Sequence, residues 1–421
     1  MPGRTGNPYS LAATAVGYHE FRSSDHRFSC HHGNLILRQA LRDALDVALR
    51  RSRVVLLAGP RQSGKTTLAH EVVDAESLNA FDLEDPASLA RLAEPMTALQ
   101  PLEGLVLIDE VQRRPELFPV LRVLADRRGT PARFLLLGSA SGDLLRQSSE
   151  SLAGRVERIT IGGFSLAEVG AHQADTLWRR GGFPLSFLAT SERDSFEWRK
   201  QFVQTLIERD LPQWGVRVPS VALHRFWTML AHYHGQTWNA AEPARALGVS
   251  ESTVRRYLDL LTDAFMVRQL RPWHANLSKR QVKAPKVYIR DSGLLHHLLG
   301  VSTARSLVSH PKVGASWEGF AIEQVLAVEP HDEAYFWATH QGAEIDLILR
   351  RGDRLFGVEC KRADAPGMTP SIRNALADLG LESVAVIYPG ARRYPIADAV
   401  EAVPLAALAT GPALFGEPDA E

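Results

Sequence analysis

An eight-residue segment of the pattern G-x4-G-K-[ST] limits what this chain can fold into more than any other feature of its sequence. Its residues are, in order, Gly59, Pro60, Arg61, Gln62, Ser63, Gly64, Lys65 and Thr66. An apolar run over 54–58 precedes the segment, and a helical pattern over 67–73 follows it. A phosphate-binding loop requires this order of strand, loop and helix, because glycine lets successive backbone N–H groups approach phosphates at the start of a helix. The segment therefore predicts a phosphate-binding loop, with an unrelated glycine-rich turn as the alternative.

The residues of this loop have expected roles toward ATP. Lys65 is placed to reach the β- and γ-phosphates, and Thr66 is placed to hold Mg²⁺. We expect the remaining loop residues, together with Thr67, to surround the phosphates. The sequence thus predicts ATP and Mg²⁺ as the ligands of this site.

A second motif follows along the chain, where four apolar residues over 105–108 lead into Asp109 and Glu110. This is a Walker B pattern, in which a strand would deliver Asp109 to the magnesium shell beside Thr66. Glu110 would then orient a water molecule for attack on the γ-phosphate. Phosphoryl transfer depends on this kind of positioning and charge neutralisation. The alternative is a strand that ends in a solvated acidic turn.

Two further residues are candidates for the same reaction. The apolar strand pattern over 133–138 ends at Ser139, whose hydroxyl is placed to sense the γ-phosphate or the attacking water. A serine at this position also suits a helix N-cap. Arg155 is a candidate arginine finger, acting within the chain or across a subunit boundary. An ordinary surface arginine in a salt bridge is the alternative.

The middle of the chain has the pattern of a helix-turn-helix. One helix is expected over 239–247, Gly248 begins the turn, and a second helix is expected over 252–263. The strand pattern over 266–270 would supply a wing. The second helix of such a unit enters the DNA major groove, where Arg255 and Arg256 could contact phosphates or guanine edges. A packing module with a solvated charged face is the alternative. A local basic run follows and adds the DNA-binding candidates Lys279, Arg280 and Lys283, with Lys286 and Arg290 at its end.

Acidic residues and a lysine recur near the C-terminus in the order E…D…E-x-K. Glu318 opens an apolar helix, Asp346 lies on an alternating strand, and Glu359 and Lys361 share one face of the next strand. Residues 350–353 suit a hairpin between the two strands. This is the layout of the PD-(D/E)XK superfamily, in which Asp346 and Glu359 would hold Mg²⁺. Lys361 would orient the attacking water or neutralise the transition state. The alternatives are a salt-bridged strand pair and a nuclease fold kept only for binding.

Four motifs carry a resemblance to a known family. They are Gly-Pro-Arg-Gln-Ser-Gly-Lys-Thr-Thr, Leu-Ile-Asp-Glu-Val-Gln, Gly-Ser-Ala-Ser and Ser-Leu-Ala-Gly-Arg. The chain resembles, over roughly residues 37–405, a large prokaryotic family of AAA-type ATPases with a C-terminal domain of PD-(D/E)XK nuclease-like type. The resemblance implies ATP binding and hydrolysis by Lys65, Thr66, Asp109 and Glu110.

The fold class expected from these patterns is α/β with several domains, because 421 residues exceed one core. Apolar strand patterns at 53–58, 78–83, 104–109 and 133–138 alternate with helical patterns, which predicts a parallel sheet covered on both faces. We expect the following divisions: a flexible N-terminal tail over 1–36, a P-loop AAA-type ATPase domain over 37–164, a helical extension or lid over 165–235, a winged helix-turn-helix-like domain over 236–290, and a PD-(D/E)XK nuclease-like α/β domain over 291–421.

The charge balance limits how a nucleic-acid partner could be held. Lysine plus arginine and aspartate plus glutamate each number 48, so the formal net charge is zero. DNA would therefore be attracted by local basic patches instead of by the chain as a whole. The cysteines, Cys30 and Cys360, make no disulfide framework, and no apolar run is long enough to span a bilayer. We expect a cytoplasmic protein with no membrane partner, which could form a homo-oligomer.

Overall fold

The computed structural model describes residues 36–129, 132–139, 151–213, 218–273, 283–412 and 414–416. Most of the predicted N-terminal tail and the DNA-binding candidates Lys279 and Arg280 lie outside these ranges. In the described part of the chain, no helix is both long and apolar enough to cross a lipid bilayer.

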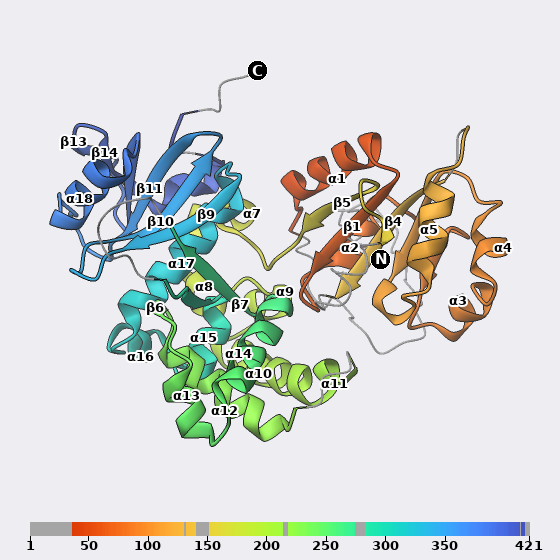
Figure 1. The fold of residues 1–421 in the computed structure, drawn as a ribbon, viewed down its shortest axis with the longest axis horizontal. Coiled ribbons are helices and arrows are strands. Elements are labelled where there is room, and N and C mark those ends of the chain that lie inside the picture. Colours follow the sequence, from red (N-terminus) through yellow and green to blue (C-terminus); the bar gives the residue numbers. More distant parts are fainter. Residues whose placement is uncertain are drawn as a thin grey trace, which may run out of the picture. The chain divides into compact units, whose positions relative to one another are not determined.

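The predicted parallel sheet is confirmed. Five strands hydrogen-bond in the order β2-β3-β4-β1-β5, and every pair is parallel. Figure 1 labels β1, β4 and β5 of this sheet. The strands are β1 (Val54–Gly59), β2 (Ala80–Asp82), β3 (Leu105–Asp109), β4 (Arg133–Ser139) and β5 (Val156–Thr160). β5 was not predicted, because its side chains are only partly covered and include a glutamate and an arginine.

This sheet has an apolar core on each face. Val54, Leu56 and Ala58 of β1 belong to one core, and Val55 and Leu57 belong to the other. Such alternation follows from successive side chains of a strand pointing to opposite faces. The first core includes residues of α5, and the second includes residues of α1 and α2. The helices of this part are α1 (Gln39–Arg51), α2 (Lys65–Ala69), α3 (Pro86–Arg91), α4 (Pro95–Leu99), the 3-10 turn η1 (Val111–Arg113) and α5 (Leu117–Ala125).

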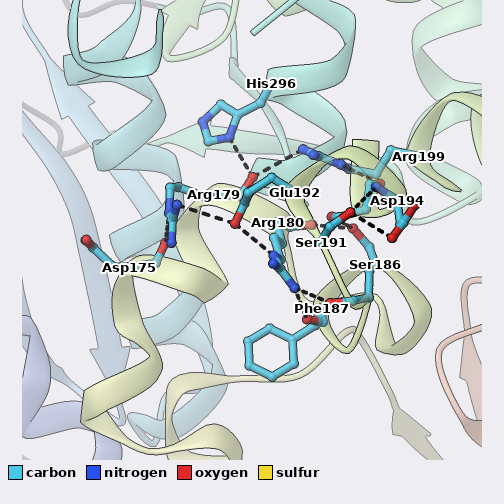
Figure 2. Close-up of polar contacts among 12 residues, drawn as sticks. Asp175, Arg179, Arg180, Ser186, Phe187, Ser191, Glu192, Asp194, Arg199 and His296 are labelled. Atoms are coloured by element: carbon cyan, nitrogen blue, oxygen red, sulfur yellow. Dashed lines mark hydrogen bonds and ion pairs between the residues drawn. The ribbon is translucent and has the colours of Figure 1, made fainter. Parts of the chain in front are cut away.

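A mostly helical stretch follows the sheet, as predicted. Its elements up to the turn at 233–235 are α7 (Leu166–Val169), η2 (Ala171–Gln173), α8 (Ala174–Arg180), α9 (Pro184–Phe187), α10 (Glu192–Thr205), the π-helical turn η3 (Leu206–Asp210), α11 (Leu211–Gln213) and α12 (Ser220–His232). A polar network joins α8, α9 and α10 (Figure 2). The guanidinium of Arg199 on α10 donates to the carbonyl oxygens of Ser195, Arg179 and Gly293. One side chain thus connects α10 to α8 and to α15 (Ser292–Leu298).

The two helices predicted for the helix-turn-helix are present as α13 (Ala241–Leu247) and α14 (Glu251–Asp263). Gly248 between them is left-handed, with φ of 68°, a conformation that glycine adopts without steric cost. The Ser250 hydroxyl accepts from the backbone N–H of Thr253 and caps α14. The buried face of α14 joins a core that extends from α10 to α15 (Ser292–Leu298), so these helices pack as one unit.

The remaining strands form a single nine-stranded sheet in the order β13-β14-β12-β11-β10-β9-β7-β8-β6. They are β6 (Gln236–Thr237), β7 (Val267–Pro272), β8 (Lys286–Ile289), β9 (Glu333–Ala338), β10 (Glu344–Arg351), β11 (Arg354–Cys360), β12 (Ser383–Tyr388), β13 (Tyr394–Ala397) and β14 (Val400–Pro404). The helices among them are α16 (Ala304–Val308), α17 (Val313–Val328), α18 (Pro370–Leu379) and the 3-10 helix η4 (Leu405–Thr410). β6 to β8 fall within the predicted winged helix-turn-helix-like domain over 236–290, but the parallel pairing of β7 with β9 joins them to the C-terminal strands.

The hairpin predicted around 350–353 is confirmed by the antiparallel pairing of β10 with β11. The strict alternation expected along β10 is wrong, however. A bulge between Ile345 and Ile348 shifts the register, and both side chains pack in one core with Ile372 of α18. An extra residue in one strand of a pair reverses the faces of the residues beyond it.

Candidate functional site

The phosphate-binding loop connects the end of β1 to the start of α2. Gln62 and Gly64 take left-handed conformations, with φ of 60° and 89°. Gly59 lies so close to the chain beyond β5 that a Cβ atom there would fall 2.1 Å from the carbonyl oxygen of Ile161. Glycine is therefore required at Gly59 for packing as well as for approach to a ligand.

Lys65 is buried at the start of α2. Its Nζ donates to the carbonyl oxygens of Gly59, at 3.2 Å, and Pro60, at 2.7 Å. Burial lowers the pKa of the Lys65 ammonium to about 8. The Lys65 side chain is thus held over the loop, where its positive charge would attract a phosphate group.

Thr66 and Asp109 bring the two predicted ATPase motifs together. The Thr66 hydroxyl donates to Oδ2 of Asp109 at 2.8 Å, and the backbone N–H of Glu110 donates to Oδ1 at 2.7 Å. Burial, reinforced by the neighbouring Glu110 carboxylate, raises the pKa of Asp109 to about 6. Glu110 itself is left-handed, with φ of 53°, so the chain turns sharply as β3 ends. A hydroxyl and a carboxylate are donors that suit Mg²⁺, so these two residues fit that ion.

Arg61 in the loop is ion-paired with two carboxylates from other elements. Its guanidinium contacts Asp210 in the π-helical turn η3, and lies 3.0 Å from Glu84 after β2. Sequence reasoning missed Asp210, because nothing local marks an aspartate in a helical stretch as a partner of the loop.

Arg38 is a second residue that the sequence analysis missed. It precedes α1 and is only 6% exposed. Its guanidinium donates to the carbonyl oxygens of Ser63, Gly162 and Gly163 at 3.0–3.1 Å, and it pairs with Glu168 of α7. Arg38 therefore holds the phosphate-binding loop against the segment that leads out of the sheet. An isolated arginine before a helix carries no sequence signal for this role.

The other two candidates for ATP hydrolysis lie in different settings. The backbone of Ser139 pairs with Gly59 across β4 and β1, which places it beside the loop. The side chain of Ser139 lies outside what the structure describes. Arg155 forms a partly exposed ion pair with Asp126. This matches the salt-bridge alternative for Arg155, and its role as an arginine finger stays a prediction.

The predicted DNA-binding residues divide into two groups. Arg255 and Arg256 are exposed on α14, and Lys283 is exposed before β8. The last two residues of the predicted basic run turn inward instead. Lys286 is 3% exposed, and Arg290 pairs with Glu323 of α17. Carboxylates from distant segments pair with both, which the local charge pattern could not reveal.

The structure brings the predicted C-terminal residues into one cluster. We call Glu318 of α17, Glu344 and Asp346 of β10, and Glu359 of β11 the acidic cluster. Lys286 of β8 lies among three of them, with Nζ 3.3 Å from Glu318 and 3.6 Å from Asp346 and in closer contact with Glu344. Lys361 pairs with Glu359, as the shared face of β11 predicts.

Burial and the repulsion between neighbouring carboxylates shift the pKa values of the acidic cluster strongly. Burial, followed by the Asp346 carboxylate, raises the pKa of Glu318 to about 7 and that of Glu359 to about 8. Burial opposes the charge of Lys286, but Glu318, Asp346 and Glu344 outweigh it and raise the pKa of the lysine well above its ordinary value. Strongly shifted pKa values are common both at functional sites and in structural ion-pair networks.

The acidic cluster does not fit a divalent metal as the side chains lie. No group of three or more histidine, cysteine, aspartate or glutamate residues in the described ranges has the arrangement that holds a metal ion. The ammonium of Lys286 lies where the carboxylates converge.

Family models match three consecutive stretches of the chain. A model described as an AAA domain matches residues 51–170, which include the phosphate-binding loop and Asp109. Two models described as domains of unknown function follow, DUF8612 over residues 171–305 and DUF4143 over residues 313–408. The AAA match confirms the predicted ATPase class for the first of these stretches.

Two curated relatives are similar over almost the whole chain. They are "Uncharacterized protein Rv2008c" of Mycobacterium tuberculosis and "Uncharacterized protein Mb2031c" of Mycobacterium bovis. Each is 52% identical over 397 residues, which cover 94% of this chain and 89% of the relative.

Solved structures show more distant similarity. The Walker-type ATPase paby2304 of Pyrococcus abyssi is 14% identical, with a TM-score of 0.45, over 63% of this chain and 96% of that one. The DNA clamp loader delta protein of Bacillus subtilis is 12% identical, with a TM-score of 0.25, over 53% of this chain and 88% of that one.

Proposed function

We propose that this chain couples ATP hydrolysis to work on DNA. The premise is that the chain belongs to the family of the mycobacterial proteins Rv2008c and Mb2031c and is an AAA-type P-loop ATPase. The observation that carries this proposal is the exposed pair Arg255 and Arg256 on α14, the second helix of the predicted helix-turn-helix, in a chain that also has a formed ATPase loop.

The residues of the loop account for ATP binding and hydrolysis. The loop backbone and Lys65 would hold the phosphates, because the lysine ammonium already lies over the loop. Thr66 and Asp109 would hold Mg²⁺, which when bound neutralises charge on the phosphates. Glu110, directly beyond the end of β3, would orient the attacking water. Arg155 would complete a neighbouring copy's site only if the chain forms an oligomer.

The helix-turn-helix supports DNA as the partner. Arg255 has an exposed ion pair with Glu251 one helical turn away, at 3.4 Å. Exposed pairs of this kind stabilise the fold little, so Arg255 can exchange its partner for a phosphate at small cost. Lys283 is exposed in the segment that leads into β8, and Lys279 and Arg280 precede it. In a chain of zero net charge, this local concentration of positive charge is what DNA binding needs.

A nucleotide-controlled binding protein is the second candidate function. Arg38 donates to the carbonyl oxygen of Ser63 in the phosphate-binding loop and pairs with Glu168 of α7. In the same helix, the backbone N–H of Leu166 donates to Oε1 of Gln324 on α17. A change in the loop on ATP binding therefore has a polar route through α7 to α17. In this case the ATPase would switch a binding surface and leave DNA unaltered.

Cleavage of DNA by the C-terminal strands has weaker support. Lys361 lies beside Glu359, and Oε2 of Glu359 is buried without a hydrogen-bond partner among the described residues, as a reactive carboxyl could be. Against this, Lys286 engages the carboxylates that would hold Mg²⁺. We therefore favour a motor or junction remodeller that does not cut.

One assay separates these functions. ATP hydrolysis is measured without DNA and with single-stranded, duplex and branched DNA, and Mg²⁺-dependent cleavage is scored in the same reactions. Work on DNA predicts stimulation of the ATPase rate by at least one DNA form, and loss of that stimulation in the double variant Arg255→Ala and Arg256→Ala. A rate indifferent to every form, together with no salt-dependent DNA binding, would favour the nucleotide switch and reject our proposal.

A further inference from the structure

We infer that the ammonium of Lys286 is the resident cation of the acidic cluster and occupies the place that a metal ion would take. The native cluster then holds no divalent metal and does not cut DNA by metal-assisted chemistry. This inference deepens the proposed function, since it specifies that the chain acts on DNA without cleaving it through these carboxylates.

The first support is the position of the ammonium. Nζ makes ion pairs with three carboxylates, because it lies 3.3 Å from Oε1 of Glu318 and 3.6 Å from Oδ1 of Asp346 and is in closer contact with Glu344. These carboxylates come from α17 and β10, so the lysine joins two separate elements. Magnesium likewise prefers several carboxylate oxygens around it.

The second support is that Lys286 cannot easily leave. Its backbone pairs with Thr237 of β6 on one side and with Leu270 of β7 on the other, so β8 is held on both of its edges. The side chain is 3% exposed, and its ammonium lies 5.7 Å from the centre of the Phe336 ring. A lysine enclosed in this way differs from a surface lysine that swings into water when a metal arrives.

The third support is that other donors already bind one oxygen each of Glu318, Asp346 and Glu359. The Tyr288 hydroxyl donates to Oε1 of Glu318 at 2.6 Å, and the backbone N–H of Cys360 donates to Oδ2 of Asp346 at 2.9 Å. Lys361 pairs with Oε1 of Glu359. A divalent ion would have to displace these partners and would also lie beside the Lys286 ammonium, which it repels.

Removing Lys286 should therefore both destabilise the chain and create a metal site. Without the ammonium, buried carboxylates are left uncompensated, which is strongly unfavourable. A divalent ion is the simplest replacement for the lost charge. Lys283→Met provides a matched control, because Lys283 lies three residues away and is exposed.

The test uses the full-length chain without nucleotide, and Mn²⁺ as the probe, with binding followed by electron paramagnetic resonance. In the wild type and in Lys286→Arg, we expect the amount of bound Mn²⁺ to stay the same when Asp346→Asn is added. Lys286→Met should melt roughly 5–10 °C below Lys283→Met, and adding Mn²⁺ should restore much of that difference. Lys286→Met should also bind one Mn²⁺ ion, and a further Asp346→Asn change should abolish that binding.

Three results would overturn the inference. The first is a wild-type chain that binds Mn²⁺ and loses it in Asp346→Asn. The second is a Lys286→Met chain that melts at the same temperature as Lys283→Met. The third is a folded Lys286→Met chain that binds no additional ion. If Lys286→Met does not fold, the wild-type and Lys286→Arg measurements still decide the matter. DNA stimulation of the wild-type ATPase is a separate readout, so its absence would reject the proposed function and leave this inference standing.

Discussion

The hydroxyl oxygen of Thr66 lies 2.8 Å from Oδ2 of Asp109, so two motifs 43 residues apart in sequence meet at one hydrogen bond. The parallel sheet creates this contact, because β1 leads into the phosphate-binding loop and β3 ends with Asp109 at the same edge. The carboxyl ends of parallel strands are the usual place for ligand sites in open α/β sheets. ATP turnover should therefore depend on residues at this edge above all others.

Replacing Lys65 tests this edge directly. Lys65→Ala removes the ammonium that lies over the loop, and we expect the ATPase rate to fall by at least about 100-fold, because charge neutralisation dominates phosphoryl transfer. Hydrolysis is measured by phosphate release, and folding by thermal melting. Lys200→Ala, at an exposed position on α10, serves as the control and should keep its rate. Intact hydrolysis in Lys65→Ala would refute the assignment of this loop.

Arg38 should matter for stability as well as for nucleotide binding. Arg38→Ala leaves the carbonyl oxygens of Ser63, Gly162 and Gly163 without their donor and Glu168 without its partner. Loss of one partner of a buried, charged hydrogen-bond network costs about 2–4 kcal/mol. We expect a lower urea midpoint and weaker binding of a fluorescent ATP analogue.

Arg42→Ala is the matched comparison for Arg38, since Arg42 lies one turn further along α1 and is much more exposed. Its effect should be within about 0.5 kcal/mol. Equal destabilisation by the two variants would contradict the role that we assign to Arg38.

The two arginines of α14 should contribute to DNA affinity through charge. Arg255→Ala and Arg256→Ala should each weaken binding and reduce the slope of log affinity against log salt by about 1, if each contacts a phosphate. Fluorescence anisotropy over a salt series measures both quantities. Arg193→Ala, exposed on α10, should change neither. An unchanged salt slope in the double variant would exclude α14 from the DNA interface.

His234 should make the fold sensitive to mild acid. Its Nδ1 accepts from the backbone N–H of Ile289 and its Nε2 donates to the carbonyl oxygen of Ala315, so the ring is buried in the neutral form. Burial lowers the pKa of His234 from 6.5 to about 3. Below pH 6.5 the unfolded chain binds a proton that the folded chain refuses, so stability falls as the pH drops toward 3.

Between pH 7 and pH 5 this histidine alone should reduce the free energy of unfolding by about 2 kcal/mol. Urea unfolding at the two pH values, compared between the wild type and His234→Gln, isolates that contribution. Glutamine can replace both hydrogen bonds but does not titrate, so the variant should lose less stability on acidification. Parallel losses in the two proteins would show that His234 is not the group responsible.

The candidate ATPase site was predictable because its signals are local. The loop over 59–66 and the acids after 105–108 each combine a residue pattern with the strand or helix that carries it, and the structure places them together. The helices on either side of Gly248 and the hairpin around 350–353 were readable for the same reason. Each depends on periodicity and turn chemistry within about twenty residues.

Other features were decided by contacts between distant segments. The local run of basic residues gave no sign that Lys286 would lie among Glu318, Glu344 and Asp346, which follow it by 32 to 60 positions. Nor did the sequence indicate that β7 pairs with β9, or that Arg38 binds the loop at Ser63.

By itself, then, the sequence determined the nucleotide loop, its acidic partner and the character of most helices and strands. Only the tertiary structure decided which charges face water and which face one another. The physical reason is that periodicity specifies which side of an element is apolar, whereas the partner of a buried charge depends on which elements pack together.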